Sequence, residues 1–339
     1  MGITGLNLTF RGPPDGPIPP FSRGGDIYGY VWWLVSSIPK GKVSTYGDVA
    51  KALGDVRSAR AVGVALSRNP YAPQVPCHRV VMSNGELGGY ALGEQRKREL
   101  LIGEGVPIAD GKVADKRVLW RSFPDGPGPL ETVAKEQEEK GKKVITEDRT
   151  FSCEIGVDAS YGGPSVGYER GVAAAVMKCG EELTQVTAGG IVTSPYVPTY
   201  FHLREAPLIY LVLEKMAHEL GKDVKSMFED MDAVLLVDGD GYMHPRRFGL
   251  ASSVGYALGI PSIGVAKSML IGSVADDRVI DKETGEVLGV VIRDGKKAYY
   301  VSSGNRVSAA SSAEQLRGSY PEVLKRAHNL CTVEGHVRT

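Results

Sequence analysis

Apolar and polar positions in the first third of the chain recur with the spacing of helices. Apolar and aromatic residues at helical spacing predict a helix over 27–38, which ends at Pro39 and Gly41. Two shorter stretches, 45–53 and 58–69, each begin with a hydroxyl residue that can cap a helix, and a Gly-Asp turn separates them. This outline is that of a helix-turn-helix, although many helical hairpins of the same outline bind nothing.

From residue 151 onward the pattern becomes that of β-strands. Apolar or β-rich runs predict the strands, and longer periodic stretches predict the helices. The predicted strands are 153–159, 171–178, 184–191, 233–237 and 262–265, with two more flanking the turn at Asp294–Gly295, and the predicted helices are 202–220 and 311–330. Three strands followed by alternating helices and strands indicate an α/β layer with a mixed sheet.

A chain of 339 residues is too long for one ordinary core, so two domains are the default expectation. The clearest boundary is the run rich in Pro and Gly at 122–128, and the stretch from Glu131 to Lys143 reads as a solvated helix or a linker. The predicted parts are a flexible segment at 1–25, a first domain at 26–121, a linker or polar helix at 122–146 and a second domain at 147–339.

The composition narrows the class of protein. Hydrophobic residues make up 42% and charged residues 24%, as in globular soluble proteins. No apolar run predicts a membrane span, and no signal peptide opens the sequence. The four cysteines are scattered without a CxxC, which argues against a zinc site and a disulfide framework and favours a reducing cytosol. We therefore expect a cytoplasmic monomer with no membrane contact.

The net charge of zero conceals a difference between the two parts. Residues 1–126 carry 16 basic and 11 acidic residues, a net of +5, and the remainder carries 24 and 29, a net of −5. A basic first part suits a phosphate-bearing partner. Ordinary scatter of solvated charges explains such a split at least as well, so charge alone decides nothing.

The strongest local signal is the block Pro76-Cys77-His78-Arg79-Val80. A cysteine beside a histidine can be activated as a thiolate, which attacks electrophilic carbon. The dipeptide alone is usually a buried cysteine next to an unrelated histidine.

The surrounding motifs change this balance. From about Ile27 to Gly111 the chain resembles the C-terminal domain of O6-alkylguanine-DNA alkyltransferases. The matching pieces, in order, are Ile38-Pro39-x-Gly41-x-Val43-x-Thr45-Tyr46-Gly47, Ala59-Arg60-Ala61-Val62-Gly63, Arg68-Asn69-Pro70, the Pro-Cys-His-Arg-Val block, Gly89-Tyr90 and Leu100-Leu101-x-x-Glu104-Gly105. The resemblance implies that Cys77 accepts the alkyl group irreversibly, while His78, through a water, and Glu104 draw off the thiol proton.

The same resemblance assigns four residues to the DNA. It implies that Arg60 enters the base stack where the damaged base is flipped out, and that Tyr46 crowds the backbone phosphate and favours the flip. It also implies that Tyr90 hydrogen-bonds the flipped guanine and that Asn69 fixes the turn toward the cysteine.

Two comparisons with that family qualify the prediction. The usual N-terminal domain is missing, because only about 25 residues precede the motifs, so stability or substrate range is expected to differ. Relatives that do not transfer carry tryptophan in place of the cysteine. Because Cys77 is present, we predict true transfer.

The second part places carboxylates near strand ends. Asp158 follows Ile155-Gly156-Val157, Asp238 closes the apolar run 234–237, and Glu205 lies near the start of a predicted helix. Acidic residues at such strand ends face the crevice of an α/β sheet and suit Mg²⁺. Each one taken singly is more often a cap or turn residue.

Here too the neighbouring motifs point to a family. Residues from about Glu147 to Leu330 resemble endonuclease V, which has a ribonuclease H-like fold. The matching pieces are Gly156-Val157-Asp158, Pro195-Tyr196-Val197-Pro198, Leu203-Arg204-Glu205, Val237-Asp238-Gly239-x-Gly241, His244-Pro245-Arg246-Arg247-x-Gly249-x-Ala251-Ser252 and Gly264-Val265-Ala266-Lys267. The fold class expected for the whole chain is thus α/β with two domains: a helical alkyltransferase domain with a helix-turn-helix, then a ribonuclease H-like mixed sheet with flanking helices.

The endonuclease V resemblance also implies a metal site. Asp158 and Asp238 would bind Mg²⁺, for which Mn²⁺ is the alternative, and Glu205 would be a further ligand or a base. No cofactor is implied for alkyl transfer.

It further implies contacts to the nucleic acid. Tyr196 would wedge into the duplex, and His244 and Lys267 would contact the phosphate backbone or the charge that develops at the cut. His328 matches a late histidine of the family or is a helix-surface residue, and the sequence leaves both open.

The implied protein repairs double-stranded DNA by alkyl transfer and by nicking on the 3′ side of inosine or another deaminated base. Asp240 stands where the family has His or Asn, and the sequence does not give the direction of its effect. Two alternatives remain at this stage: a damage sensor whose only catalysis is the nuclease, and a nuclease that acts on RNA. One hypothesis for the fusion is that the DNA contact of one domain raises the local concentration of the other on DNA. It predicts that a split near Gly126 leaves both activities intact and lowers the apparent affinity.

Overall fold

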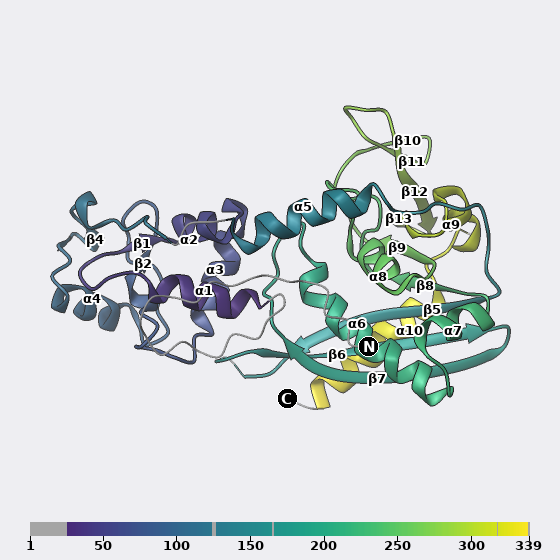
Figure 1. Ribbon diagram of the computed structural model, residues 1–339, viewed down its shortest axis with the longest axis horizontal. Helices are drawn as coiled ribbons and strands as arrows, with labels where there is room; N and C mark the ends of the chain where they lie inside the picture. The colour runs from purple at the N-terminus through teal and green to yellow at the C-terminus, as the bar shows by residue number, and fades with distance from the viewer. Residues whose placement is uncertain (1–25, 124–126, 165, 317, 338–339) are drawn as a thin grey trace. The chain divides into compact units, whose positions relative to one another are not determined.

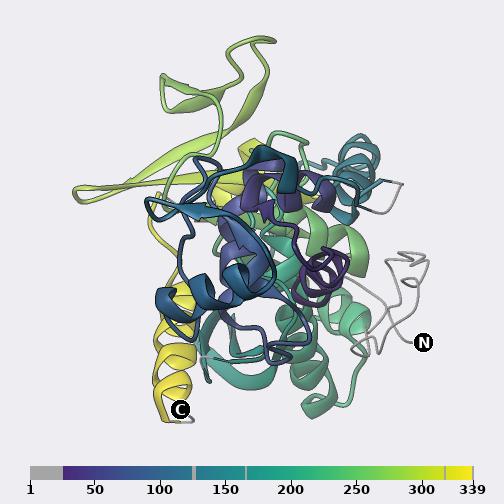
Figure 2. The same cartoon turned by 90° about the vertical axis from the view of Figure 1, so that its left-hand side faces the viewer.

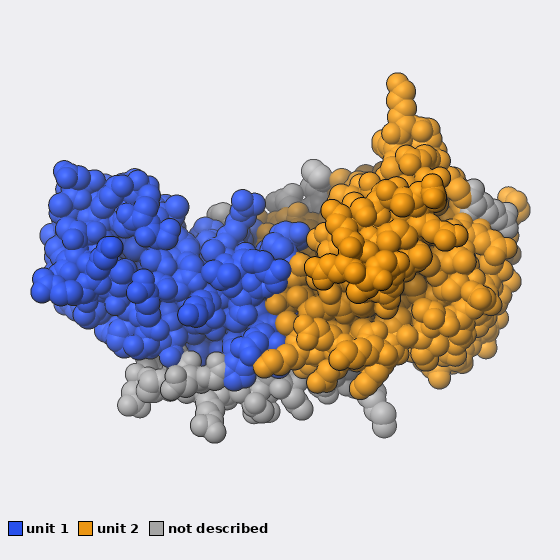
Figure 3. Space-filling view, turned by 90° about the horizontal axis from the view of Figure 1, so that it is seen from above, with its two compact units in different colours: residues 1–133, 164–168, 193–198 blue, residues 134–163, 169–192, 199–339 orange. Residues whose placement is uncertain are grey.

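The computed structural model describes residues 26–123, 127–164, 166–316 and 318–337, so the prediction for segment 1–25 lies outside the described residues. The chain forms two compact units, shown in blue and orange in Figure 3. Unit 1 comprises residues 1–133, 164–168 and 193–198, and unit 2 comprises 134–163, 169–192 and 199–339. Unit 1 therefore includes two short segments from within the predicted second domain.

Unit 1 is mainly helical, with two small sheets (Figure 1). The helices are α1 (Ile27–Ser36), α2 (Tyr46–Leu53), α3 (Ala59–Ser67) and α4 (Glu94–Gly103). The strands are β1 (Ser44–Thr45), parallel to β2 (Val80–Val81), and β3 (Ile108–Ala109), antiparallel to β4 (Lys112–Val113).

Local chemistry sets the ends of the helix-turn-helix. The Thr45 side chain caps α2 by accepting from the backbone N–H of Asp48, and Gly54 ends the helix with a left-handed φ of 105°. A short 3-10 turn, Val56–Ser58, then leads into α3. The predicted pair of short helices with a tight turn is confirmed.

The buried first helix of unit 1 packs against the two inserted segments. Asp26 caps α1 by accepting from the backbone N–H of Gly29 at 2.8 Å. The hydroxyl of Tyr168 donates to the same carboxyl group at 2.5 Å, and the backbone N–H of Tyr28 donates to the carbonyl of Thr193 at 3.2 Å. The segments 164–168 and 193–198 thus form part of the packing around α1.

Unit 2 is built on a nine-stranded sheet among the described residues. The strands are β5 (Cys153–Gly162), β6 (Glu169–Cys179), β7 (Glu182–Val192), β8 (Ala233–Val237), β9 (Ser262–Ala266), β10 (Ser273–Ala275), β11 (Arg278–Ile280), β12 (Val287–Asp294) and β13 (Lys297–Asn305). Their order is β10-β11-β12-β13-β9-β8-β5-β6-β7, with β5, β8 and β9 parallel and the other pairs antiparallel. This confirms the predicted mixed sheet.

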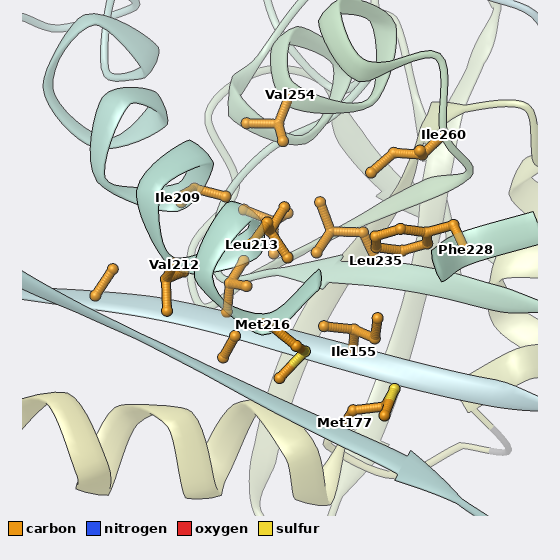
Figure 4. Packing of buried hydrophobic residues seen from close by; sticks show 14 of the residues in the cluster. Ile155, Met177, Ile209, Val212, Leu213, Met216, Phe228, Leu235, Val254 and Ile260 are labelled. Atoms are coloured by element: carbon orange, nitrogen blue, oxygen red, sulfur yellow. The ribbon is translucent and has the colours of Figure 1, made fainter. Parts of the chain in front are cut away.

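Helices cover both faces of this sheet (Figure 1, Figure 2). They are α6 (His202–Glu219), α7 (Val224–Asp230), α8 (Leu250–Leu258), α9 (Ala309–Leu316) and α10 (Glu322–Val337), and α5 (Pro129–Gly141) precedes the first strand. One core joins α6, α7 and α8 to alternate strand residues such as Ile155 and Leu235 (Figure 4). The intervening residues, such as Val234 and Leu236, face α9 and α10 in a second core.

Two sequence predictions are wrong in detail. The predicted helix over 311–330 is two helices, because Gly318 has a φ of 74° and Pro321, which lacks a backbone N–H, precedes α10. The cysteines were expected to form no disulfide, yet Cys153 and Cys179 are bonded. They lie directly opposite each other in the β5–β6 pair, a register that their spacing of 26 residues does not reveal.

The sequence predictions for the remaining elements fit with small shifts, and the polar stretch at 131–143 proves to be the helix α5 rather than an irregular linker. Helices α7 and α8 and strands β10 and β11 were not predicted. Among the described helices, none combines the length and the apolar character needed to cross a membrane.

Candidate functional sites

Cys77 stands in a short 3-10 turn, Cys77–Arg79, which directly precedes β2. Its side chain is almost completely buried. The Nδ2 of Asn69 donates to the carbonyl of Val75 at 3.0 Å and to the Cys77 Sγ at 3.4 Å. Asn69 therefore ties together the segment that leads to the cysteine and also contacts the sulfur itself.

His78 is held by Glu104, which lies at the end of α4. The His78 Nε2 is 3.0 Å from Glu104 Oε1, and Arg79 donates to both carboxylate oxygens at 2.7 and 2.8 Å. Burial acts to raise the pKa of Glu104, but the hydrogen bonds from Arg79 and His78 outweigh it and lower this pKa to about 2. Glu104 is thus an ionised acceptor, which requires the proton of the neutral His78 ring to be on Nε2.

That tautomer leaves His78 Nδ1 as a lone-pair acceptor. The atom is buried and makes no hydrogen bond to any residue that the structure describes. Burial lowers the pKa of His78, so the ring is neutral near pH 7. An oriented, neutral imidazole with one open nitrogen is the arrangement that a general base needs.

The cysteine is not ionised in advance. Burial raises the pKa of the Cys77 thiol, although the hydrogen bond from Asn69 and the charge of Lys97 act in the other direction. Lys97 in α4 is fully buried, and its Nζ donates to the carbonyls of Val80 and Gly89. Burial lowers the pKa of Lys97 to about 8. A base must therefore take the thiol proton as the sulfur reacts.

Three further residues of the predicted DNA site belong to unit 1. Tyr90 is half-buried beside His78, with ring centroids 6.3 Å apart, and its hydroxyl is buried without a hydrogen bond to the described residues. Tyr46 is the first residue of α2 and is half-buried. Arg60 is exposed in the first turn of α3. The phenol of Tyr90 thus has hydrogen-bonding capacity that the described chain leaves unused.

In unit 2 the sheet register brings two aspartates together. Val157 of β5 is the parallel partner of Val237 of β8, and Asp158 and Asp238 are the next residue on each strand. The two carboxylates therefore lie side by side where β8 ends, although β5 continues past Asp158 to Gly162. The sequence predicted that the two side chains lie together in the crevice of the sheet, and this register explains why they are neighbours.

Glu205 reaches the same carboxylates from the first turn of α6. It is 5% exposed, and its Oε1 accepts from the hydroxyl of Tyr161 at 2.7 Å. Burial raises the pKa of Glu205 to about 8, and the charges of Asp158 and Asp238 add to the rise. Burial also raises the pKa of Asp238, and Asp158 contributes to that shift. The nearby carboxylates thus disfavour the charged forms of Glu205 and Asp238.

Two cationic or polar side chains accompany the aspartates. Lys267, which follows β9, forms an ion pair with Asp238, and Nδ1 of His328 in α10 is 2.7 Å from Asp158 Oδ2. His328 is thus both exposed on the surface of α10 and in contact with Asp158, which fits either of the two interpretations left open for it. Among the residues that the structure describes, no group of three or more His, Cys, Asp or Glu side chains is placed so that it could hold a metal ion.

The donor set nevertheless fits a divalent cation. Hard cations such as Mg²⁺ take carboxylate oxygens and keep several waters, so two or three carboxylates suffice. The mutual repulsion that raises the pKa of Glu205 is the repulsion that a bound cation would remove. By their chemistry Asp158, Asp238 and Glu205 are the candidate ligands, although their side chains are not placed around a common point.

The remaining predicted residues have different surroundings. Tyr196 lies in the segment 193–198 and is 57% exposed. His244 is buried: its Nε2 is 3.0 Å from the carbonyl of Thr199, and its Nδ1 accepts from the backbone N–H of Arg246. Both ring nitrogens are used within unit 2, so the predicted phosphate contact of His244 has no geometric support. Burial raises the pKa of Asp240 to about 7, and its Oδ1 is buried without a partner among the described residues.

Some residues of these sites were not found from the sequence. Arg79 orients Glu104, Lys97 lies under the cysteine turn, and Tyr161 donates to Glu205. Arg79 directly follows the Cys-His pair, which was a usable signal. Nothing local to Lys97 or Tyr161 distinguishes them from ordinary helix or strand residues, because their roles come from tertiary packing.

Comparisons with known proteins identify the families of both parts of the chain. Residues 136–329 match the family model described as Endonuclease V, and residues 26–106 match the model described as 6-O-methylguanine DNA methyltransferase, DNA binding domain. A bifunctional methyltransferase/endonuclease of Picrophilus torridus is 38% identical over 309 residues, which cover 90% of this chain and 95% of that protein. Its counterpart from Thermoplasma volcanium is 31% identical and covers 93% of this chain and 91% of that protein.

A solved structure shows the fold of the second part. Endonuclease V of Ciona intestinalis, at 24% identity, covers 62% of this chain and 99% of its own with a TM-score of 0.52.

The fold and the two sites define a DNA-repair enzyme that joins a cysteine-bearing transferase domain to a carboxylate-bearing nuclease domain. The chain belongs to the endonuclease V family and, with both of its domains, to the bifunctional methyltransferase/endonucleases. The endonuclease V family is generally metal-dependent.

Proposed function

We propose that unit 1 transfers alkyl groups from the O6 position of guanine in double-stranded DNA to Cys77. The proposal is carried by His78, whose Nε2 is fixed by Glu104 and whose buried Nδ1 is open. The thiol proton passes to Nδ1, directly or through a water, and the sulfur attacks the alkyl carbon. The carbon–oxygen bond breaks, its electron pair stays on guanine, and the guanine gains one proton to balance the one that left the thiol.

We also propose three contacts between unit 1 and the DNA. The open hydroxyl of Tyr90 supplies a hydrogen bond for a flipped guanine, and Arg60, exposed in α3, is suited to fill the space that the base leaves. Tyr46 at the start of α2 is proposed to crowd the phosphate of the flipped nucleotide.

Alkyl transfer is tested by mass spectrometry after incubation with duplex DNA that carries one O6-methylguanine. One added methyl on the peptide that contains Cys77, and none in a Cys77→Ala protein, is expected. DNA binding without a methyl on Cys77 would instead favour a damage sensor.

For unit 2 we propose nicking of DNA on the 3′ side of inosine and other deaminated bases. Asp158, Asp238 and Glu205 would hold Mg²⁺, or Mn²⁺ in its place. The bound ion supplies charge stabilisation at the phosphate and a water of lowered pKa. Lys267, paired with Asp238, lies where it can neutralise charge that develops at the cut, and the exposed Tyr196 is proposed to wedge beside the lesion.

A nicking assay on an end-labelled duplex with one deoxyinosine tests the nuclease. A cut just 3′ of the inosine with Mg²⁺, none with chelator and none in the Asp238→Ala protein are expected. A matched inosine-containing RNA distinguishes the RNA alternative. Metal-dependent cutting that survives Asp238→Ala would remove the metal assignment.

We further propose that the protein acts as a monomer in the cytosol, where its DNA substrate is found. A disulfide inside cells is unusual outside hyperthermophiles. Whether Cys153 and Cys179 are bonded in the cell is therefore a test of the proposed location in the cytosol. Sedimentation of the purified chain tests whether the protein is a monomer. Thiol labelling of freshly lysed cells tests whether the cysteines are bonded there.

A further inference from the structure

Gln137 in α5 is a polar residue that no part of the proposed chemistry uses, although its side chain is only 2% exposed. It uses its whole hydrogen-bonding capacity within unit 2. Nε2 donates to the carbonyl of Phe248 at 2.9 Å and to His202 Nδ1 at 3.2 Å, and Oε1 accepts from Arg246 Nε at 2.8 Å. Because a guanidinium can only donate, the amide has one orientation, and the only other side chain with the same two donors and one acceptor, that of Asn, is one methylene shorter.

Arg246 extends this network to Thr199. Its Nη2 donates to the Thr199 carbonyl at 2.6 Å and to the Thr199 hydroxyl at 2.9 Å, and its guanidinium lies 4.4 Å over the ring of Tyr200. His244 adds a hydrogen bond from Nε2 to the same carbonyl. Burial lowers the pKa of both His202 and His244 to about 3, so both rings keep these neutral contacts near pH 7.

Thr199 has a backbone conformation that needs such support. Its φ is 67°, in the left-handed region, which a β-branched residue adopts only with strain. Strained residues of this kind persist where the surrounding contacts over-determine them. Thr199 accepts three hydrogen bonds, two from Arg246 and one from His244.

The position of Thr199 in the chain connects its strained backbone to the start of α6 and to Glu205. It comes three residues after Tyr196 and three before His202, the first residue of α6. Glu205 lies in the first turn of the same helix. The direction in which the chain leaves Thr199 therefore sets where α6 begins and where its first turn places the Glu205 carboxyl.

We propose that Gln137 is a positioning residue of the nuclease, which acts through Arg246 to hold Thr199 left-handed and thereby to place Glu205. Helix α5, whose C-terminal half opens the region that matches endonuclease V, is then a working part of the nuclease and not only a connection. This inference rests on the proposed nuclease function.

The test uses the full chain with three variants. Gln137→Leu removes both donors and the acceptor at similar size, and Glu138→Gln changes the neighbouring exposed residue as the matched control. Thr199→Gly combined with Gln137→Leu asks for rescue, because glycine adopts a positive φ without strain. Nicking of inosine duplex with Mg²⁺ gives kcat and KM, and methyl transfer to Cys77 is measured on the same samples.

For Gln137→Leu we expect kcat for nicking to fall about tenfold to a hundredfold with KM for DNA changed little, since a small misplacement of a catalytic group costs this much. Methyl transfer and Glu138→Gln should match the unchanged protein, and Thr199→Gly should restore part of the lost kcat. Unchanged nicking by Gln137→Leu, no recovery with Thr199→Gly, or equal loss of both activities would each overturn the inference. Failure of the unchanged protein to nick at all would instead overturn the proposed function.

Discussion

At the scale of single residues, the reactivity of Cys77 depends on its neighbours and not on a preformed thiolate. Burial raises the pKa of the thiol, and burial also lowers the pKa of His78, the nearest base. Glu104 opposes the second effect, because its hydrogen bond and charge favour protonation of His78. The carboxylate therefore both fixes the tautomer and keeps the imidazole basic enough to accept the thiol proton.

Glu104→Gln should consequently slow methyl transfer by about 10²- to 10⁴-fold, the usual contribution of an oriented general base. In the unchanged protein the rate should hold through pH 6.5 and fall only at lower pH, because the lowered pKa keeps His78 neutral until then. Single-turnover transfer from O6-methylguanine duplex between pH 4.5 and 8 measures both.

Glu99→Gln is the matched control, since Glu99 lies on the exposed side of α4, where it contacts Gln95 and the exposed Arg96 of the same helix. A rate that already halves well above pH 6.5, or a Glu104→Gln protein that transfers normally, would contradict this account of His78.

At the scale of elements, close packing between β5 and α10 brings Asp158 and His328 together. Gly156 lies two residues before Asp158, and a Cβ there would stand 2.6 Å from the backbone carbon of Val323 and 2.7 Å from the backbone nitrogen of Leu324. Backbone atoms cannot rotate away as a side chain can. Position 156 therefore requires glycine, because β5 and α10 lie too close together there for a Cβ.

Gly156→Ala should push α10 from the sheet, lower the free energy of unfolding of unit 2 by about 1–3 kcal/mol and reduce nicking. Methyl transfer should be unchanged, because Cys77 lies in unit 1. Gly103→Ala, in open space on α4, is the control for a glycine-to-alanine change without a clash. Equal thermal stability and nicking of Gly156→Ala and the unchanged protein would show that α10 has room to move.

The Cys153–Cys179 bond joins the start of β5 to the end of β6. A link that closes a loop of 26 residues restricts the unfolded chain and is worth about 3 kcal/mol. Replacing both cysteines by serine should lower the unfolding temperature of unit 2, and a strong reductant should lower that of the unchanged protein but not of the double variant. If the reductant shifts both proteins alike, the stabilisation does not come from this bond.

The elements also show what the sequence could and could not supply. The apolar runs before Asp158 and Asp238 were predictable as strands, because they are local patterns, but β5 continues to Gly162 and so places Asp158 within the strand and not near its end. The disulfide was not, since pairing of Cys153 with Cys179 depends on the hairpin register. The break between α9 and α10 was signalled by Gly318 and Pro321 and could have been found. The part played by Gln137 was not accessible, because all three of its partners are more than 60 residues away.

At the scale of the whole molecule, the compact units do not coincide with the two halves of the sequence. Unit 1 includes the segments 164–168 and 193–198, which come from the region that matches endonuclease V. Within unit 1, Tyr168 packs against the rings of Tyr28 and Trp32, with centroids 6.0 and 5.4 Å away. A chain split near Gly126 would remove these partners from α1. Tethering alone, which predicts intact halves, is therefore an incomplete reason for the fusion.

The buried contact between Asp26 and Tyr168 offers a test that leaves the chain whole. Asp26→Ala removes the cap of α1 and leaves the Tyr168 hydroxyl without its acceptor, so the free energy of unfolding of unit 1 should fall by about 1–2 kcal/mol. Asp26→Asn keeps one oxygen, which can still accept from the Gly29 N–H, but its NH2 group replaces the oxygen that accepts from Tyr168, so its stability should lie between those of Asp26→Ala and the unchanged protein. The temperature at which methyl transfer to Cys77 is lost measures the effect, and the fragment 1–126 should lose transfer at a temperature at least as low as Asp26→Ala does. A fragment that transfers up to the same temperature as the full chain would mean that unit 1 does not need the two inserted segments, and the halves would then be independent after all.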